Sequence, residues 1–181
     1  DQKAHPAFAH QIEGIQGVSG IHLPADEFFR TLRSLCDRYG ALLIADEIQS
    51  GYGRSGKFYA HQYSGVRADI ITSAKGMANG FPIGAVLISP AIKAEYGMLG
   101  TTFGGNPVCC AGALSVISRL DDTFLQQVRE KSAYVFEQLQ NAPGIEAVTG
   151  LGLMIGIKTA KQLAKHYRTI ESLRNASIEE L

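Results

Sequence analysis

Two side chains of opposite charge stand just beyond two short apolar runs of the chain. Asp46 closes the run Ala41–Ala45, and Lys75 follows the run Ile70–Ile71 by a few residues. A carboxylate can keep a neighbouring ring nitrogen protonated, and a lysine amine that has lost its charge can attack a carbonyl carbon. If both runs are strands of one sheet, the carboxylate and the amine could share a site.

The pattern around these residues predicts alternating strands and helices. Apolar residues recur at helical spacing after Ala25, Asp26 and Glu27 favour the start of that helix, and Gly40 favours its end. A β-α-β unit places its two strands in parallel through a right-handed crossover, and ligands bind at the carboxyl ends of such strands. We expect strands over 7–15, 41–45, 68–72, 83–89, 145–148 and 151–157, and helices over 25–40, 58–63, 107–120 and 123–140. Ser89-Pro90 and Asn106-Pro107 each have the form of a helix cap followed by proline.

The residue types suit pyridoxal phosphate. This cofactor needs a lysine for its aldehyde, a carboxylate for its ring nitrogen and donors for its phosphate. Gln49 could bond the phenolic oxygen, Ile48 could pack on the ring, and the turn 101–106 precedes a helix N-terminus that suits a phosphate. Each feature also has an ordinary explanation, because a strand-end aspartate often caps a turn and a lysine beside glycine is usually solvated. Spacing alone leaves both readings open.

Composition excludes several classes of protein. Of 181 residues, 45% are hydrophobic and 19% charged, which are values of a folded domain. Lys and Arg number 17, as do Asp and Glu, so net charge gives no reason to seek nucleic acid or an anionic membrane. No apolar run approaches the roughly 20 residues of a membrane span. Three cysteines make no disulfide framework and the five histidines show no metal spacing, so we expect a cytoplasmic protein without a metal.

Three segments, LLIADEIQSGYGRSGKF, ITSAKGMANGFPIGAVL and GTTFGGNPVCCAGAL, closely resemble class III pyridoxal-phosphate aminotransferases. Within them the chain is most similar to the acetylornithine/ornithine group, which includes enzymes that use succinylated ornithine. The likeness runs from about Ile12 to Ile157. It implies an α/β fold, part of the large domain of a fold-type I transferase with a mainly parallel sheet, over residues 1–142. The start of a small domain over 143–157 and a helical tail over 158–181 would follow.

The resemblance also implies a role for each matching residue. Lys75 would be the catalytic residue that links to the cofactor aldehyde and moves the substrate proton. Thr102 would bind the phosphate of the partner subunit's cofactor, and Thr101 would lie near the substrate. The remaining cofactor contacts would come from the segment Asp46, Glu47, Ile48 and Gln49.

The implied reaction moves the δ-amino group of an N-acylated ornithine to 2-oxoglutarate, as in arginine biosynthesis, in a homodimer with active sites at the subunit interface. Glu13 matches the glutamate that opens the family's Glu-x-x-Gln-Gly motif and could line the site. Val18 stands where many members have a glutamate that pairs with a gating arginine, which puts that gate in doubt and indicates a different acyl preference. Arg54 is expected to shape its loop.

An alternative is a catalytically incomplete fragment or a fusion. We expect the family's phosphate-binding loop and its arginine for the substrate α-carboxylate to lie outside the chain, so turnover should be low or absent. The tail from Ile155 resembles a helix-hairpin-helix segment of NAD-dependent DNA ligases and excision nucleases, in which Lys158 and Lys161 would add charge toward DNA. Met154 replaces the first hairpin glycine of that motif.

Overall fold

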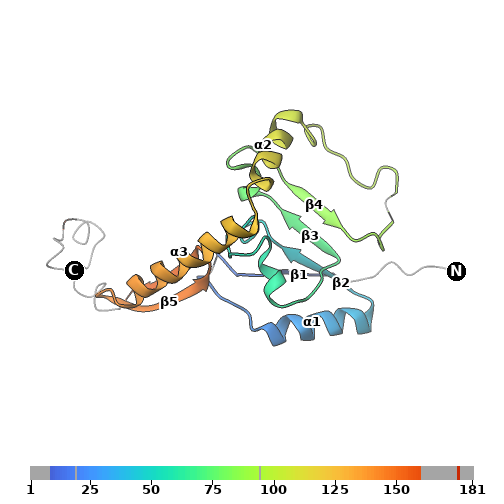
Figure 1. Ribbon diagram of the computed structural model, residues 1–181. Coiled ribbons are helices and arrows are strands. Elements are labelled where there is room, and N and C mark those ends of the chain that lie inside the picture. The colour runs from blue at the N-terminus through green and yellow to red at the C-terminus, as the bar shows by residue number, and fades with distance from the viewer. Residues whose placement is uncertain (1–8, 19, 94, 160–174, 176–181) are drawn as a thin grey trace.

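The computed structural model describes residues 9–18, 20–93, 95–159 and 175. Its centre is a four-stranded sheet in the order β1-β2-β3-β4, as Figure 1 shows. The strands β1, β2 and β3 are parallel, and β4 is antiparallel to β3. Their bounds are Ala9–Glu13 for β1, Leu42–Asp46 for β2, Ile70–Ser73 for β3 and Ala85–Ile88 for β4. The α/β sheet predicted from the sequence is therefore confirmed.

Helix α1, Asp26–Tyr39, connects β1 to β2 and packs along the sheet (Figure 1). Asp26 and Glu27 in its first turn stabilise the helix, because their negative charges lie near the positive end of the helix dipole. Gly40 ends the helix in the left-handed conformation, with φ of 64°, and its N–H bonds the carbonyl of Cys36. Phe29 and Cys36 form the buried side of the helix, so the helix and its cap agree with the prediction.

Asp69 fixes the amino-terminal end of the sheet. Its Oδ2 accepts the N–H of Leu43 at 2.8 Å and a guanidinium N–H of Arg33 at 2.7 Å. Burial pushes the pKa of Asp69 upward, but these bonds and the charge of Arg33 outweigh it and hold the pKa below its usual value. One carboxylate thus ties α1 and β2 to the entrance of β3.

Two short 3-10 helices follow the strand ends. The first, η1, spans Ala60–Tyr63 after the loop that leaves β2, and the second, η2, spans Lys75–Ala78 directly after β3. The chain then returns through β4 and a long exposed segment to α2, Pro107–Ile117. Asn106 caps this helix by accepting the N–H of Cys109 at 3.0 Å, as the sequence predicts.

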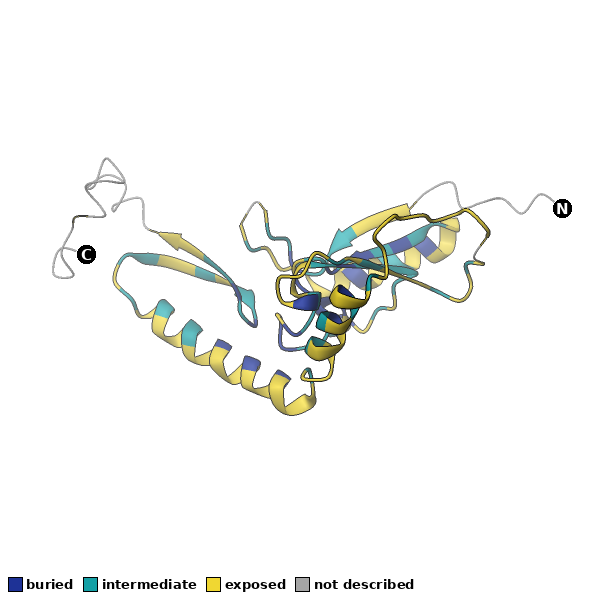
Figure 2. Ribbon diagram, turned by 90° about the horizontal axis from the view of Figure 1, so that it is seen from above, coloured by how far each residue is buried: buried dark blue, intermediate teal, exposed yellow. Residues whose placement is uncertain are grey.

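Helix α3 and a two-stranded hairpin form the other end of the molecule (Figure 1). Helix α3 spans Asp122–Gln140, and the hairpin strands are β5, Ile145–Leu151, and β6, Met154–Thr159. Figure 2 shows that the buried residues of α3 face the hairpin while its other side is exposed. Gly152 joins the hairpin to the rest, because its carbonyl accepts the hydroxyl of Ser132 at 2.7 Å and the carbonyl of Arg54 accepts the N–H of Leu153 at 2.9 Å.

Two details differ from the prediction. Ser89-Pro90 begins a single turn and not a helix, because Ile92 is the only residue of 90–93 that is even partly buried and no apolar face supports further turns. Helix α2 ends at Ile117 and not at Leu120. The part of the predicted helix-hairpin-helix tail over residues 155–159 is wrong, because these residues belong to strand β6, paired with β5, and not to a helix. The rest of that prediction lies outside the described residues, apart from 175.

Within the part of the chain that the structure describes, no helix is long and apolar enough to cross a membrane. Over the same residues, no three side chains of His, Cys, Asp or Glu gather as a metal ion would need.

Candidate active site

The carboxyl edge of the sheet brings three of the expected groups together. Asp46 ends β2, and its register partner on β3 is Thr72, a short step before Lys75. Beyond the strand ends, the amine of Lys75 lies 3.5 Å from the side-chain oxygen of Gln49, a long hydrogen bond. A carboxylate, an amine and an amide therefore share one edge, as the parallel order of β2 and β3 predicts.

Lys75 holds a backbone conformation that side chains rarely adopt. Its φ is +41°, and Asn79, which ends η2, has φ of +48°. Such residues cost on the order of 1–3 kcal/mol each and persist where the surrounding structure fixes them, often at functional sites. Lys75 is exposed, so its amine is accessible to a ligand.

Asp46 is oriented by two hydrogen bonds. Nε2 of Gln11 donates to its Oδ2 at 2.6 Å, and the N–H of Ile48 donates to its Oδ1 at 3.0 Å. These bonds fix the direction of the carboxylate and leave lone pairs for another donor. Sequence reasoning missed Gln11. The only signal for it was its place on the expected strand, two residues before Glu13 and so on the same face.

Glu13 shapes the turn that lies against Gln49. It ends β1 in register with Asp46, and its Oε2 accepts the N–H of Gly17 at 3.0 Å. A methyl group on Gly17 would lie 2.5 Å from Oε1 of Gln49, so a side chain at this position would displace the Gln49 amide. Val18 is 94% exposed and contributes nothing to the edge.

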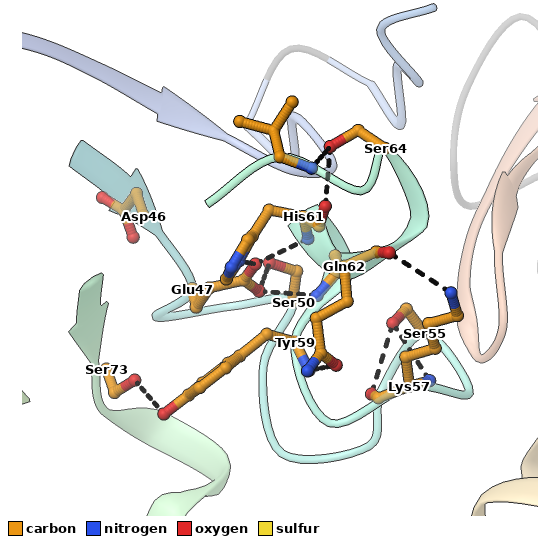
Figure 3. Close-up of polar contacts among 12 residues, drawn as sticks. Asp46, Glu47, Ser50, Ser55, Lys57, Tyr59, His61, Gln62, Ser64 and Ser73 are labelled. Carbon is orange, nitrogen blue, oxygen red and sulfur yellow. Dashed lines mark hydrogen bonds and ion pairs between the residues drawn. The ribbon is translucent and has the colours of Figure 1, made fainter. Parts of the chain in front are cut away.

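Glu47 is fully buried and bonded entirely within the chain, as Figure 3 shows. Its Oε1 accepts the N–H of His61 at 2.8 Å and faces Nδ1 of the same residue at 2.7 Å. Its Oε2 accepts the hydroxyl of Ser50 at 2.7 Å and the N–H of Ala60 at 3.0 Å. Burial raises the pKa of Glu47, but the bonds from His61, Ser50 and Ala60 outweigh burial and hold that pKa below its ordinary value of 4.5.

The structure thus gives the Glu47 side chain a supporting role, because a carboxylate with 0% exposure offers no surface to a ligand. Contact between Glu47 and a cofactor stays a prediction. Ile48 is partly buried beside it, and its predicted packing against a ring also stays a prediction.

A cavity of about 670 Å³ adjoins Lys75 and Gln49. It lies between the loops that follow β2 and β3, the junction of α2 and α3, and the hairpin. Its walls include three cations, Arg54, Lys75 and Arg119, and no carboxylate. The cavity therefore suits an anion near Lys75. Asp46 is not among the residues that line the cavity.

Thr101 and Thr102 are not brought to Lys75 within this chain. Both are exposed on the segment before α2, where the hydroxyl of Thr101 accepts the N–H of Gly104 at 3.1 Å. Neither threonine lines the cavity beside Lys75. Their predicted contacts, with a partner subunit's cofactor and with substrate, stay predictions.

The groups at the edge fit pyridoxal phosphate. The Lys75 amine can attack an aldehyde, the Asp46 carboxylate can accept a protonated ring nitrogen, and the Gln49 amide can bond a phenolic oxygen. Within the described chain, the buried hydroxyl of Thr72 has no hydrogen-bond partner. The end of β3 therefore has a hydroxyl, that of Thr72, to which no described residue is hydrogen-bonded.

Fold and edge together define an α/β protein that presents a lysine and a carboxylate on neighbouring parallel strands, the arrangement of a pyridoxal-phosphate transferase. Residues 2–178 match the family described as Aminotransferase class-III. The chain belongs to the class III aminotransferases, and the predicted family is confirmed.

Named relatives agree with this assignment. The chain is 45% identical over 157 residues to an acetylornithine aminotransferase of Corynebacterium efficiens, covering 85% of this chain and 39% of that protein. It is 44% identical over 161 residues to a succinylornithine transaminase of Yersinia pseudotuberculosis, covering 84% and 39%. The chain thus spans about two fifths of the length of these relatives.

A solved structure shows the same fold. The ornithine aminotransferase of Toxoplasma gondii, crystallised with oxidised glutathione and with partial occupancy of pyridoxal phosphate at its active site, superposes with a TM-score of 0.75. It is 31% identical, and the match covers 86% of this chain and 38% of that one. The fold described above is therefore that of pyridoxal-phosphate aminotransferases.

Proposed function

We propose that this chain provides the lysine-bearing strand ends of a transaminase that moves the δ-amino group of an N-acylated ornithine to 2-oxoglutarate. The observation that carries the proposal is the meeting of Lys75 and Gln49 beside Asp46 at one sheet edge. The choice of an acylated ornithine is supported by relatives named for acetylornithine and succinylornithine. A cytoplasmic location fits such a biosynthetic role.

The chain's residues divide the work between them. When bound, pyridoxal phosphate supplies a reactive aldehyde and an electron-withdrawing ring. Nζ of Lys75 binds the cofactor and later moves the proton of the carbon that bears the reacting amine. Asp46, held by Gln11, keeps a proton on the ring nitrogen, and Gln49 orients the phenolic oxygen. The cations around the adjoining cavity favour substrates that carry carboxylates.

We also propose a homodimer in which Thr102 reaches the partner subunit's cofactor phosphate and Thr101 lies near its substrate. Support comes from large apolar side chains on the same segment, since Leu99 is 73% exposed and Phe103 is 82% exposed. Exposed apolar surface of this kind is typical of protein interfaces. We place the end of the large domain at residue 142, and the hairpin of β5 and β6 begins just after this boundary. The hairpin continues to Thr159, so the second boundary lies after Thr159 and not after 157.

Borohydride trapping tests the central assignment. The chain is mixed with pyridoxal phosphate, reduced and digested, and the modified peptide is identified by mass spectrometry. We expect modification at Lys75, an absorbance band of bound cofactor, and loss of both in Lys75→Ala. Lys93→Ala, at an exposed turn, is the matched control and should keep both. Trapping spread over several lysines in the parent, or unchanged in Lys75→Ala, would contradict the proposal.

The substrate assignment needs a separate measurement. N-acetylornithine, N-succinylornithine and ornithine are added in turn to the cofactor-loaded chain, and the rate at which the cofactor band changes is compared. We expect an acylated ornithine to react fastest, with the band restored by 2-oxoglutarate. A faster reaction with free ornithine would replace the acylated substrate while leaving the role of Lys75 intact.

A further inference from the structure

Close to the segment of Lys75 lies a group of buried and half-buried hydroxyl side chains that the proposed chemistry does not use. We define the hydroxyl cluster as Tyr52, Tyr59 and Ser73. Ser73 is 3% exposed and Tyr59 is 8% exposed, and the hydroxyl of Ser73 donates to that of Tyr59 at 3.3 Å (Figure 3). The rings of Tyr52 and Tyr59 meet edge to face, with centroids 6.0 Å apart. The cluster therefore joins the loop after β2 to the last residue of β3.

The cluster touches the segment of Lys75 from two sides. Ser73 lies two positions before Lys75 and carries the bond to Tyr59. On the far side, a methyl group placed on Gly76 would lie 3.6 Å from Cβ of Tyr52, so Tyr52 packs under the residue that follows the lysine. Tyr52 and Lys75 also line the same cavity.

Backbone strain coincides with these contacts. The described residues contain three non-glycine residues with positive φ, and two of them are Tyr52, at +55°, and Lys75, at +41°. Strained residues of this kind persist only where contacts over-determine them. Here Tyr52 lies close to Gly76, which directly follows Lys75, and Ser73, two positions before Lys75, bonds Tyr59.

The cluster acts by position and not by charge. Burial raises the pKa of Tyr52 to about 12, and the neighbouring phenol of Tyr59 adds to the rise. The phenol therefore stays neutral over the range in which enzymes work, and it supplies a donor without a negative charge. A neutral group can hold the lysine segment in place but does not draw the ammonium toward itself.

We infer that Tyr52, Tyr59 and Ser73 are positioning residues that hold the left-handed backbone of Lys75 and so aim its amine at the site beside Gln49. This inference rests on the proposed function, because it assigns a purpose to the direction of the amine. It goes beyond the proposed function because it names residues that position Lys75 without contacting the cofactor or the substrate.

Removing single hydroxyls tests the inference while keeping the rings. The variants are Tyr52→Phe, Tyr59→Phe and Ser73→Ala, and the matched control is Tyr63→Phe. Tyr63 ends η1, which follows the same loop, but its hydroxyl donates to the carbonyl of Ser55 at 2.9 Å and not to any residue of the cluster. Two readouts are taken. One is the rate of acylation at Lys75 relative to Lys93 in the same sample, measured by peptide mass spectrometry. The other is the pH profile of the absorbance band of bound pyridoxal phosphate.

We expect Tyr59→Phe and Ser73→Ala, each of which removes the bond between their hydroxyls, to change the Lys75-to-Lys93 ratio by about fivefold and to displace the pH profile. Tyr52→Phe keeps the Cβ that lies under Gly76 and should change both readouts less. Tyr63→Phe should leave both readouts within twofold of the parent even if it lowers overall stability. The double variant Tyr59→Phe with Ser73→Ala should change the ratio no more than either single variant, because both remove the same bond.

The outcomes separate the inference from the function on which it rests. Tyr59→Phe and Ser73→Ala variants that match the parent within twofold, or that match Tyr63→Phe, would overturn the inference even if the cofactor is trapped at Lys75. If the effects of Tyr59→Phe and Ser73→Ala add in the double variant, the two side chains do not act through one shared bond, which also contradicts the inference. If the parent fails to trap the cofactor while the acylation ratio still responds to the cluster, the proposed function fails and the support of Lys75 stands.

Discussion

Replacing Glu47 by glutamine is a direct test of the buried network that supports the strand end. In the native chain each carboxylate oxygen accepts two hydrogen bonds, from Ser50, Ala60 and His61. Glutamine keeps one oxygen and turns the other into an N–H₂ donor. Whichever way the amide faces, it then opposes donors, and a backbone N–H of Ala60 or His61 loses its partner.

The size of the effect follows from burial. A buried donor left without a partner costs about 1–3 kcal/mol. Glu47 is 0% exposed, so water cannot replace the lost bonds. We expect a loss of about 1–3 kcal/mol, a sizeable share of the roughly 5–15 kcal/mol of a typical domain. At a urea slope of about 2 kcal/mol per molar, the unfolding midpoint falls by about 1 M.

Urea unfolding followed by circular dichroism measures this change, with Glu146→Gln as the control. Glu146 pairs with Lys158 at 3.3 Å, but their side chains are 49% and 67% exposed. A surface pair of this kind contributes little, so the control should stay within about 0.5 kcal/mol of the parent. A Glu47→Gln variant that loses less than about 1 kcal/mol would refute the reasoning.

The Glu47→Gln variant should also change how the free energy of unfolding depends on pH in the acid range. The pKa of Glu47 is lower in the folded chain than its ordinary value of 4.5, so below that pH the unfolded state binds more protons than the folded one. The contribution of Glu47 is therefore complete above about pH 4.5 and is lost as the pH falls through the folded pKa. The stability of Glu47→Gln should depend less steeply on pH in this range.

Two further substitutions test how the outer elements are fixed. Gly152→Ala would place a methyl group 2.4 Å from the carbonyl of Arg54 at a φ of +62°, so urea unfolding should show a loss of about 3 kcal/mol. Gly65→Ala, at a similar φ of +70° with open space around it, should lose only about 1 kcal/mol, and equal losses would contradict the close approach. Asp69→Asn should lose about 1–3 kcal/mol in the same assay, because the amide weakens the bonds from Arg33 and Leu43, and an unchanged midpoint would count against that role.

Much of the fold followed from local pattern. The helical spacing after Ala25 and the caps Gly40 and Asn106 depend on residues within one or two turns of each other, which is why the structure bears them out. Ser89-Pro90 shows the limit of such signals. The hydroxyl of Ser89 accepts the N–H of Ala91 at 3.4 Å as a cap would, yet no helix follows because nothing apolar packs behind it.

Some residues of the candidate site could likewise be predicted from the sequence, and others could not. Asp46, Gln49 and Lys75 were candidates because they lie at or soon after recognisable strands, and parallel strands carry their ends to one edge. Their roles were predicted only from the resemblance of three segments to class III aminotransferases. Gln11 could not be named, since its bond to Asp46 spans 35 positions and depends on how β1 and β2 align. Asp46 and Glu47 are neighbours in the sequence, yet Asp46 is half-buried and Glu47 is fully buried, and no local pattern predicts this difference.

The sequence by itself determined which residues could do chemistry, because strand ends, glycine turns and helix caps are encoded within a few positions. Only the tertiary structure decided what each of them faces. Asp46 stays half-buried and bonds Gln11 on the neighbouring strand, whereas Glu47 is fully buried and bonds His61 of η1, 14 positions away. The physical reason is that burial and hydrogen-bond satisfaction are settled by segments distant in the chain, which meet only when the sheet and its loops pack together.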